Sequence, residues 1–233
     1  MKLQEENIPL TIDEIFIVES LNLNFKTILE LGCGTAAMTQ KIATNGHTRE
    51  VIACDVDEIQ HKKNLELDIK NIKFLLCGAQ KLPIKDESID FVFMFKSFHH
   101  VPKEYMNDAL SEIKRVLKPR GMLYISEPLH MGKQNELVAM FHNEEEVRKD
   151  AFECIKDFVE NEEMKLFKEF FFQTPITYKS FDDFVKRQMH NTYNEISVSD
   201  ELKQKVNDKY NEFGGKELTL LKPFRVDILQ KNR

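Results

Sequence analysis

Apolar positions in the first half of the chain fall into short runs, and helical patterns separate these runs. The runs are too continuous for half-exposed strands and are typical of strands covered on both faces of a parallel sheet. Their regular alternation with helices predicts a doubly wound α/β fold with right-handed crossovers. The expected strands are Thr27–Leu31, Glu50–Cys54, Lys73–Leu76, Asp90–Phe95 and Met122–Ser126, and the expected helices are Ala36–Asn45, Glu58–Ile69 and Lys103–Leu117.

The second half of the chain has a different pattern. Lys133–Phe167 follows a helical spacing, and Lys168–Tyr178 reads as a strand. Helices that lie between the fifth strand and the last strands can cover the carboxyl edge of the sheet, which is where ligands bind in open α/β sheets. Two short helices are expected at Ser180–His190 and Asp200–Phe213, and one or two final strands at Leu218–Gln230.

Length and charge narrow the classes of protein that the chain can represent. Its 233 residues are enough for one large α/β domain, and its formal net charge of −6 argues against a broad nucleic-acid-binding surface. No apolar run reaches the length of a membrane span, and the first residues do not resemble a signal peptide. The four cysteines form no C-x-x-C pair, so we expect a reduced, cytoplasmic protein.

The segment ILELGCGTAA (Ile28–Ala37) passes from an apolar run into a glycine-rich turn and then into helix formers. Gly32, Gly34 and Ala37 fit the G-x-G-x-x-G/A pattern of nucleotide-binding turns. Asp55 ends the next strand, where an acid can accept hydrogen bonds from both hydroxyls of a ribose. The alternative role for Asp55 is to cap the helix that follows. The turn and the acid together predict an adenosine-containing cofactor.

Glu30 discriminates between the two candidate cofactors, NAD and S-adenosylmethionine. A carboxylate at the end of a buried strand costs several kcal/mol unless a cation accompanies it. NAD would present its pyrophosphate near this turn, and a carboxylate would repel it. S-adenosylmethionine presents an α-ammonium and a sulfonium, which a carboxylate would attract. A structural ion pair between Glu30 and a lysine is the alternative explanation.

Three segments carry a resemblance to a known family. ELGCGTA (Glu30–Ala36) resembles motif I of the class I S-adenosylmethionine-dependent methyltransferases. CGAQKLPIKDESIDFVFMFKSFHHV (Cys77–Val101) and EIKRVLKPRGMLYISEP (Glu112–Pro128) resemble the branch that contains the quinone-biosynthesis C-methyltransferases, the type 11-like methyltransferases. The resemblance covers about residues 27 to 128.

The resemblance implies a Rossmann-like, mostly parallel sheet of seven strands, with a helical cap inserted after the fifth strand. Within one structural domain we expect a cofactor-binding core at residues 1–130 and a mostly helical cap with one late strand at 131–215. Residues 216–233 would supply a closing strand. The implied cofactor is S-adenosylmethionine, with S-adenosylhomocysteine as its product. We expect a small-molecule acceptor, because the acidic composition and an enclosing cap favour it over RNA.

The resemblance also assigns residues to the cofactor. The glycine turn and the fourth-strand loop would surround the methionyl part, Asp55 would hold the ribose, and Val56 and Ala79 would contact adenine. Two positions depart from the family pattern, because Gly78 stands where an aspartate is usual and Gln80 where a glutamate is usual. Losing the aspartate removes an acceptor for the adenine amino group. The implied cofactor-binding set is Glu30, Gly32, Cys33, Gly34, Asp55, Val56, Gly78, Ala79, Gln80 and Lys96.

His99 and His100 follow the fourth expected strand, beside the position of the transferred methyl group. We expect them as the catalytic candidates, because an imidazole can take a proton from an acceptor near neutral pH. Their alternative role is structural. These histidines could form a metal site with His130, His142 and Glu127, but the spacing matches no known metal signature, so no metal is expected.

Other functions remain open at this stage. They are a tRNA- or protein-modifying methyltransferase, a protein that binds the cofactor without methyl transfer, and an NAD-type oxidoreductase. The sequence makes no prediction about the oligomeric state.

Overall fold

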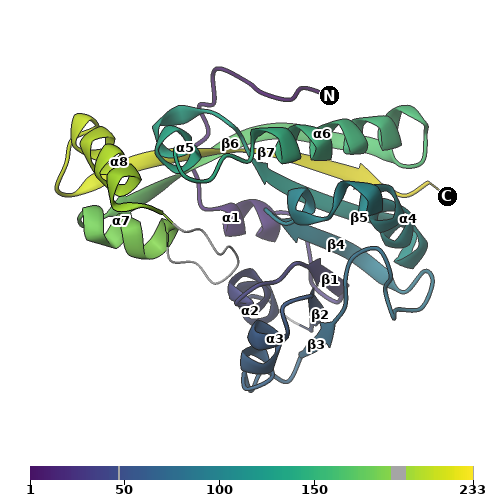
Figure 1. Cartoon of the computed structure of the whole chain (residues 1–233). Coiled ribbons are helices and arrows are strands. Elements are labelled where there is room, and N and C mark those ends of the chain that lie inside the picture. The colour runs from purple at the N-terminus through teal and green to yellow at the C-terminus, as the bar shows by residue number, and fades with distance from the viewer. Residues whose placement is uncertain (47, 190–197, 233) are drawn as a thin grey trace.

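The computed structural model describes residues 1–46, 48–189 and 198–232, and its centre is one seven-stranded sheet (Figure 1). The strand order is β3-β2-β1-β4-β5-β7-β6. Strands β1 to β5 pair in parallel, and β7 is antiparallel to both β5 and β6. The strands are β1 (Thr27–Leu31), β2 (Glu50–Asp55), β3 (Ile72–Leu76), β4 (Ile89–Phe95), β5 (Leu117–Pro128), β6 (Lys165–Tyr178) and β7 (Leu218–Gln230).

The predicted doubly wound, mostly parallel sheet of seven strands is confirmed. The order reverses between β1 and β4, so the loops after these two strands diverge and leave a crevice at the carboxyl edge. The helices are α1 (Glu14–Glu19), α2 (Ala37–Thr44), α3 (Glu58–Asn64), α4 (Met106–Val116), α5 (Gly132–Ala139), α6 (Glu145–Glu160), α7 (Phe181–Gln188) and α8 (Asp200–Glu212), with 3-10 turns η1 (Phe98–His100) and η2 (Lys103–Tyr105). None of the helices in the described part of the chain is both long and apolar enough to cross a membrane.

Side chains of alternating strand positions form a separate core on each face of the sheet. Leu29 of β1 packs in one cluster with Leu110 of α4 and Ile155 of α6. Ile28, the preceding residue, packs in the other cluster with residues of α1 and α2. This two-sided burial explains why the strands read as continuous apolar runs in the sequence.

The structure corrects several predicted boundaries in the second half. The stretch expected to be helical over Lys133–Phe167 contains α5 and α6, and β6 already begins at Lys165. Glu162 adopts a left-handed φ of 59°, which ends the helical path after α6 and turns the chain toward the sheet. The closing segment is a single strand, β7, which lies between β5 and β6.

Two helices also differ from the sequence-based expectation. The helix predicted at Glu58–Ile69 ends as α3 at Asn64, and the helix predicted at Ser180–His190 ends as α7 at Gln188; His190 lies outside the described residues. The short helix α1 was not predicted at all. It is six residues long, too short for a clear periodic signal, and Asp13 caps it by accepting a hydrogen bond from the Ile15 backbone amide.

The segment expected as a cap divides into two structural parts. Helix α6 buries Ala151, Ile155 and Phe158 in the same core cluster as α4 and the sheet. Leu137 of α5 instead belongs to a separate cluster with residues of α7 and α8, near the ends of the long strands β6 and β7 (Figure 1). Helix α6 is therefore part of the sheet core.

We expect Ile155→Ala to lower the free energy of unfolding by about 2–5 kcal/mol, because the side chain is fully buried between α6 and the sheet. Val147→Ala on the same helix is the matched control, since Val147 is 42% exposed and should change stability by about 0.5 kcal/mol or less. Denaturant unfolding of both variants measures the difference. Equal effects would mean that α6 is not part of the core.

Candidate active site

A cavity of about 1090 Å³ opens at the carboxyl edge of the sheet, where the strand order reverses. Its walls come from the loops after β1, β2, β3 and β4, and from parts of α5 and β7 together with the loop before α6. Segments that are far apart in the sequence therefore meet at one site. Of the residues assigned to the cofactor from the sequence, all except Glu30 line the cavity.

The glycine turn after β1 is held in place by its neighbours. Gly32 has a φ of 72°, and a Cβ atom built on it would lie 2.5 Å from the Cβ of Ser97, so only glycine fits there. The Ser97 hydroxyl donates a hydrogen bond to the Leu31 carbonyl at 2.8 Å. Asn64 of α3 donates a hydrogen bond from its side-chain amide to the Gly34 carbonyl at 2.7 Å. Neither Ser97 nor Asn64 was singled out from the sequence.

Asp55 stands at the tip of β2 and faces this turn. One carboxylate oxygen accepts the Gly34 backbone amide at 2.7 Å, and the other accepts the Asp57 amide at 3.0 Å. Asp57, not Asp55, is the N-cap of α3, so capping does not account for Asp55. Val56 follows it with 70% of its surface exposed, which presents an apolar surface to the cavity.

Glu30 lies behind the glycine turn rather than in the cavity wall. Its side chain is 2% exposed, and its carboxylate accepts a hydrogen bond from the Thr39 hydroxyl of α2 at 2.6 Å. Burial raises the pKa of Glu30 to about 8. The charge of Lys96 opposes this rise, but the Lys96 ammonium is itself paired with Glu14 of α1. Among the described residues, Glu30 thus has no lysine that pairs with it alone.

Lys96 and Cys33 also line the cavity. The backbone amide of Lys96 donates to the Ser126 carbonyl at 2.8 Å, and its φ of 57° turns the chain out of β4. The Cys33 side chain is 7% exposed, and burial raises the pKa of its thiol.

The side chain of Gln80 covers the position of the missing aspartate. A Cβ atom built on Gly78 would lie 2.3 Å from the Gln80 side-chain oxygen. Gln80 therefore places an amide group where a side chain at position 78 would otherwise begin. Ala79 lies between them in the cavity wall and is 8% exposed.

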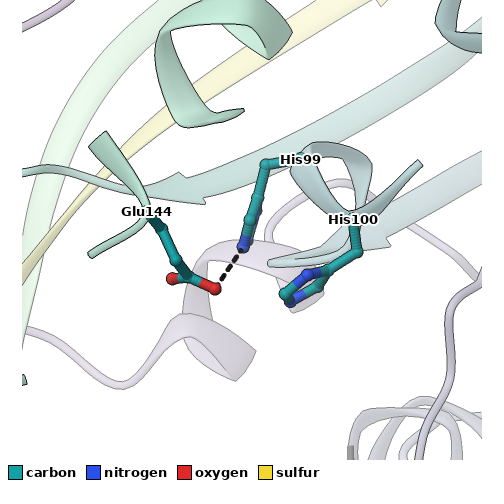
Figure 2. Close-up of side chains that lie close together, drawn as sticks. All are labelled: His99, His100 and Glu144. Carbon is teal, nitrogen blue, oxygen red and sulfur yellow. Dashed lines mark ion pairs between the residues drawn. The ribbon is translucent and has the colours of Figure 1, made fainter. Parts of the chain in front are cut away.

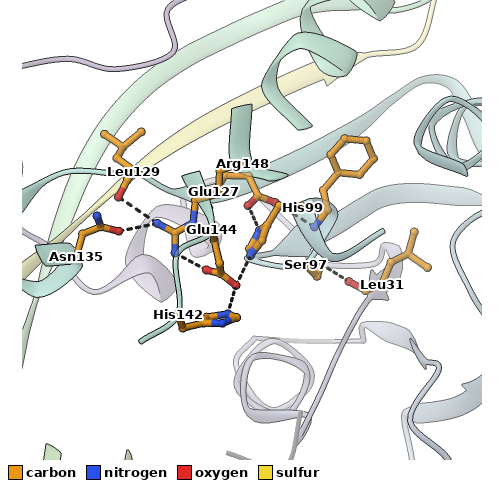
Figure 3. A network of polar contacts seen from close by, with 10 residues as sticks. Leu31, Ser97, His99, Glu127, Leu129, Asn135, His142, Glu144 and Arg148 are labelled. Atoms are coloured by element: carbon orange, nitrogen blue, oxygen red, sulfur yellow. Dashed lines mark hydrogen bonds and ion pairs between the residues drawn. The ribbon is translucent and has the colours of Figure 1, made fainter. Parts of the chain in front are cut away.

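A polar network closes the far end of the cavity (Figure 3). Glu127, at the end of β5, accepts hydrogen bonds from the backbone amides of Phe98 and His99 and contacts Nδ1 of His99. The other ring nitrogen of His99, Nε2, lies 3.6 Å from Oε1 of Glu144. Arg148 holds the second oxygen of Glu144 at 2.5 Å. The network joins β5, η1 and α6 through buried charges.

These contacts shift the pKa values of the network. Burial alone would lower the pKa of His99, but Glu127 and Glu144 outweigh it and raise that pKa to about 9. The His99 and Arg148 charges hold the pKa of Glu144 well below its usual range, although burial opposes them. For His100, enclosure by its surroundings and the neighbouring His99 charge lower the pKa.

The two candidate catalytic histidines occupy different places. His100 lines the cavity, whereas His99 is 4% exposed and lies behind the wall. Their ring centroids are 4.0 Å apart. Glu144, which contacts His99, was not predicted, because it lies 45 residues further along the chain in a run of acidic residues typical of a solvated helix start.

The comparisons with known proteins agree with this geometry. Residues 29–125 match the model of the methyltransferase domain family. The chain is 34% identical over 115 residues to a ubiquinone/menaquinone biosynthesis C-methyltransferase of Rickettsia prowazekii. Residues 29–125 form a class I methyltransferase domain. The match with the Rickettsia protein covers 46% of this chain and 45% of that relative, so the chain spans less than half the length of the curated relative.

Solved structures show the methyltransferase fold over nearly the whole chain. A putative methyltransferase from Bacillus halodurans has a TM-score of 0.66 and 17% identity, and the match covers 95% of this chain and 99% of that one. An S-adenosylmethionine-dependent methyltransferase from Aquifex aeolicus has a TM-score of 0.58 and 20% identity, with 93% and 89% covered. At these identities the likeness shows the fold.

S-adenosylmethionine is the cofactor of this type of methyltransferase domain, and the cavity fits it. Gly32 and Gly34 leave the backbone accessible, Asp55 supplies a carboxylate for hydroxyl groups, and Val56 supplies an apolar surface for a base. The buried carboxylate of Glu30 lies behind the turn and suits a cationic group better than a pyrophosphate.

We expect Glu30→Gln to stabilise the free protein more at about pH 9 than at about pH 5. The unfolded carboxyl loses its proton near 4.5 and the folded one near 8, so rising pH through this window favours unfolding of the wild type. The Glu30→Gln variant has no carboxyl group at this position, so its stability does not fall for this reason as the pH rises. Each kcal/mol by which the variant is more stable than the wild type should raise its Tm by about 2–4 °C.

Glu50→Gln, which changes an exposed side chain on β2, is the control for the Glu30 variant. Thermal unfolding at both pH values measures the effect. A Glu30→Gln gain that is the same at both pH values would contradict the raised pKa.

Proposed function

We propose that this chain transfers a methyl group from S-adenosylmethionine to a small-molecule acceptor. The observation that carries the proposal is the continuity of the cavity, which runs from the glycine turn and Asp55 to His100 and then between α5 and β7. One end offers the groups that a nucleoside and an amino acid need. The other end offers a space lined by both polar and apolar side chains, which suits a small acceptor.

The residues at the cofactor end each have a physical role in this proposal. The Asp55 carboxylate, oriented by two backbone amides, accepts hydrogen bonds from ribose hydroxyls. Burial raises the pKa of Glu30 in the free protein, and a positive methionyl group on the other side of the glycine turn would favour the ionised carboxylate. The Gln80 side-chain oxygen, which lies beside Gly78, accepts the adenine amino group in place of the aspartate of the family pattern.

The acceptor end positions the reacting atom. When bound, S-adenosylmethionine supplies a methyl group on a sulfonium, which is a good leaving group. The acceptor atom forms a bond to this carbon as the carbon–sulfur bond breaks, the electron pair stays on sulfur, and an acceptor that carries a proton there releases it. Alignment of the acceptor atom in line with the methyl carbon and the sulfur contributes most of the rate enhancement. Asn135 and His100 offer polar contacts to the acceptor, and Val138 of α5 offers an apolar one.

Methyl transfer can be tested before the acceptor is known. The purified protein is incubated with S-adenosylmethionine labelled in its methyl group and with separate small-molecule, RNA and protein fractions of a cell extract. We expect label to appear in the small-molecule fraction and to depend on the protein. Asp55→Ala should reduce the transfer by weakening cofactor binding, and Asp182→Ala, at an acid on α7 outside the cavity lining, is the matched control.

Label in the RNA or protein fraction would overturn the small-molecule acceptor while keeping methyl transfer. Label in no fraction, together with cofactor binding in calorimetry, would favour a protein that binds the cofactor without transferring its methyl group.

The role of Gln80 predicts a rescue by a second substitution. Gln80→Ala should weaken S-adenosylhomocysteine binding by about 5- to 10-fold, because one hydrogen bond of about 1 kcal/mol is lost. The double variant Gly78→Asp with Gln80→Ala should regain most of this affinity, since the aspartate then has room and supplies the acceptor.

Calorimetric titration with S-adenosylhomocysteine measures the affinities, and NADH serves as a ligand that should not bind. Gln204→Ala on α8 is the control, because its side chain contacts only Asp208 of the same helix among the hydrogen bonds described. Wild-type affinity in the Gln80→Ala variant would exclude Gln80 from the adenine site.

A further inference from the structure

We infer that His99, His100 and Glu144 bind a divalent transition-metal ion at the acceptor end of the cavity. Ligand atoms of these three residues lie within 4.8 Å of one another. Figure 2 shows the two imidazoles and the carboxylate pointing toward one another from η1 and from the start of α6. Two neighbouring residues of the 3-10 turn thus meet a carboxylate that arrives from a different part of the chain.

The distances already approach those of a metal site. Nε2 of His99 and Oε1 of Glu144 are 3.6 Å apart. Two ligands of a tetrahedral ion with bonds of about 2.0–2.2 Å are about 3.4 Å apart. His142 brings another imidazole to the same oxygen, because its Nε2 lies 2.8 Å from Oε1 of Glu144. His142 therefore contacts the same carboxylate, although it is not one of the three proposed ligands.

The surrounding residues hold the ligands as the outer shell of a metal site does. A metal-binding histidine usually donates its other ring nitrogen to a carboxylate, which fixes the orientation of the ring. Glu127 contacts Nδ1 of His99 in this way and leaves Nε2 facing Glu144. Arg148 binds the other oxygen of Glu144, and its guanidinium also donates to the Asn135 side chain at 2.9 Å. Oε1 of Glu144 is thereby left to face the imidazoles.

A simple ion pair accounts for only part of this arrangement. Arg148 and one histidine would be enough to neutralise Glu144, yet three imidazoles gather around the cluster. Convergent imidazoles and one carboxylate are a donor set for zinc, cobalt, nickel or iron, and imidazole nitrogens disfavour magnesium and calcium. The spacing of these residues matches no known sequence motif, which is why the sequence did not predict the site.

The proposed ion would also be accessible from the cavity. His100 and Glu144 both line it, so an incoming ligand can reach the cluster. As part of the proposed function, the ion would bind an oxygen or nitrogen of the acceptor, orient it and favour loss of its proton. His100 would then act as a metal ligand rather than as a free base. The acceptor class that follows is a molecule with an oxygen or nitrogen donor beside the methylated atom.

Metal binding can be tested without cofactor or acceptor, so its failure is separate from a failure of the proposed function. The full chain is stripped with a chelator and titrated with Co²⁺, Zn²⁺ and Mg²⁺, followed by calorimetry and, for Co²⁺, by visible absorption. We expect one equivalent of Co²⁺ or Zn²⁺ to bind and Mg²⁺ to bind far more weakly. The Co²⁺ spectrum should lack the charge-transfer band of a thiolate ligand.

Loss of an outer-shell partner typically weakens metal binding by about 10- to 100-fold. His100→Asn and Glu144→Gln each remove a ligand, so each should weaken Co²⁺ binding by more than this. Glu127→Gln should weaken it by about 10- to 100-fold. Two controls should bind as the wild type does: His61→Gln on α3, and Cys77→Ala, which removes a thiol from the cavity wall. Circular dichroism and S-adenosylhomocysteine binding check that each variant is folded.

Absence of Co²⁺ and Zn²⁺ binding by the folded wild type would overturn the inference. Wild-type metal affinity in both the His100→Asn variant and the Glu144→Gln variant would also overturn it. Loss of metal binding in the Cys77→Ala variant would overturn it too.

Discussion

The contact between Gly32 and Ser97 brings the ends of β1 and β4 together at the point where the sheet reverses its order. No side chain can separate them, because a Cβ atom on Gly32 would lie 2.5 Å from the Cβ of Ser97. This close approach sets the thickness of the turn between the buried Glu30 and the cavity. The end of β2 and the end of α3 are held against the same turn, because Asp55 accepts the Gly34 amide and Asn64 donates to the Gly34 carbonyl.

The charged groups along the cavity are arranged differently at its two ends. Near the glycine turn, Glu30 is buried and, within the described part of the chain, no lysine pairs with it alone, which suits a ligand that brings a positive charge. At the acceptor end, carboxylates, imidazoles and Arg148 hold one another in fixed positions. The first arrangement leaves a buried carboxyl group whose ionised form a cationic ligand would stabilise, and the second brings carboxylates and imidazoles into one hydrogen-bonded network.

The second half of the chain serves the site in two ways. Helix α6 is packed into the sheet core, and the residue at its start, Glu144, reaches the cavity from a rigid support. Helix α5 contributes residues to the cavity wall while its buried side packs with α7 and α8 in a separate cluster. This end of the cavity therefore lies between a part of the sheet core and a separate cluster of helices.

The sequence by itself determined the alternation of strands and helices, the glycine turn and the position of Asp55, because these depend on local periodicity and on the short motif around β1. Only the tertiary structure decided that α6 joins the core, that Gln80 covers Gly78 and that Glu144 meets His99. These contacts depend on how segments pack against one another. Glu144 illustrates the reason: its neighbours in the sequence are acidic and exposed, and only the packing of α6 against η1 turns it toward the histidines.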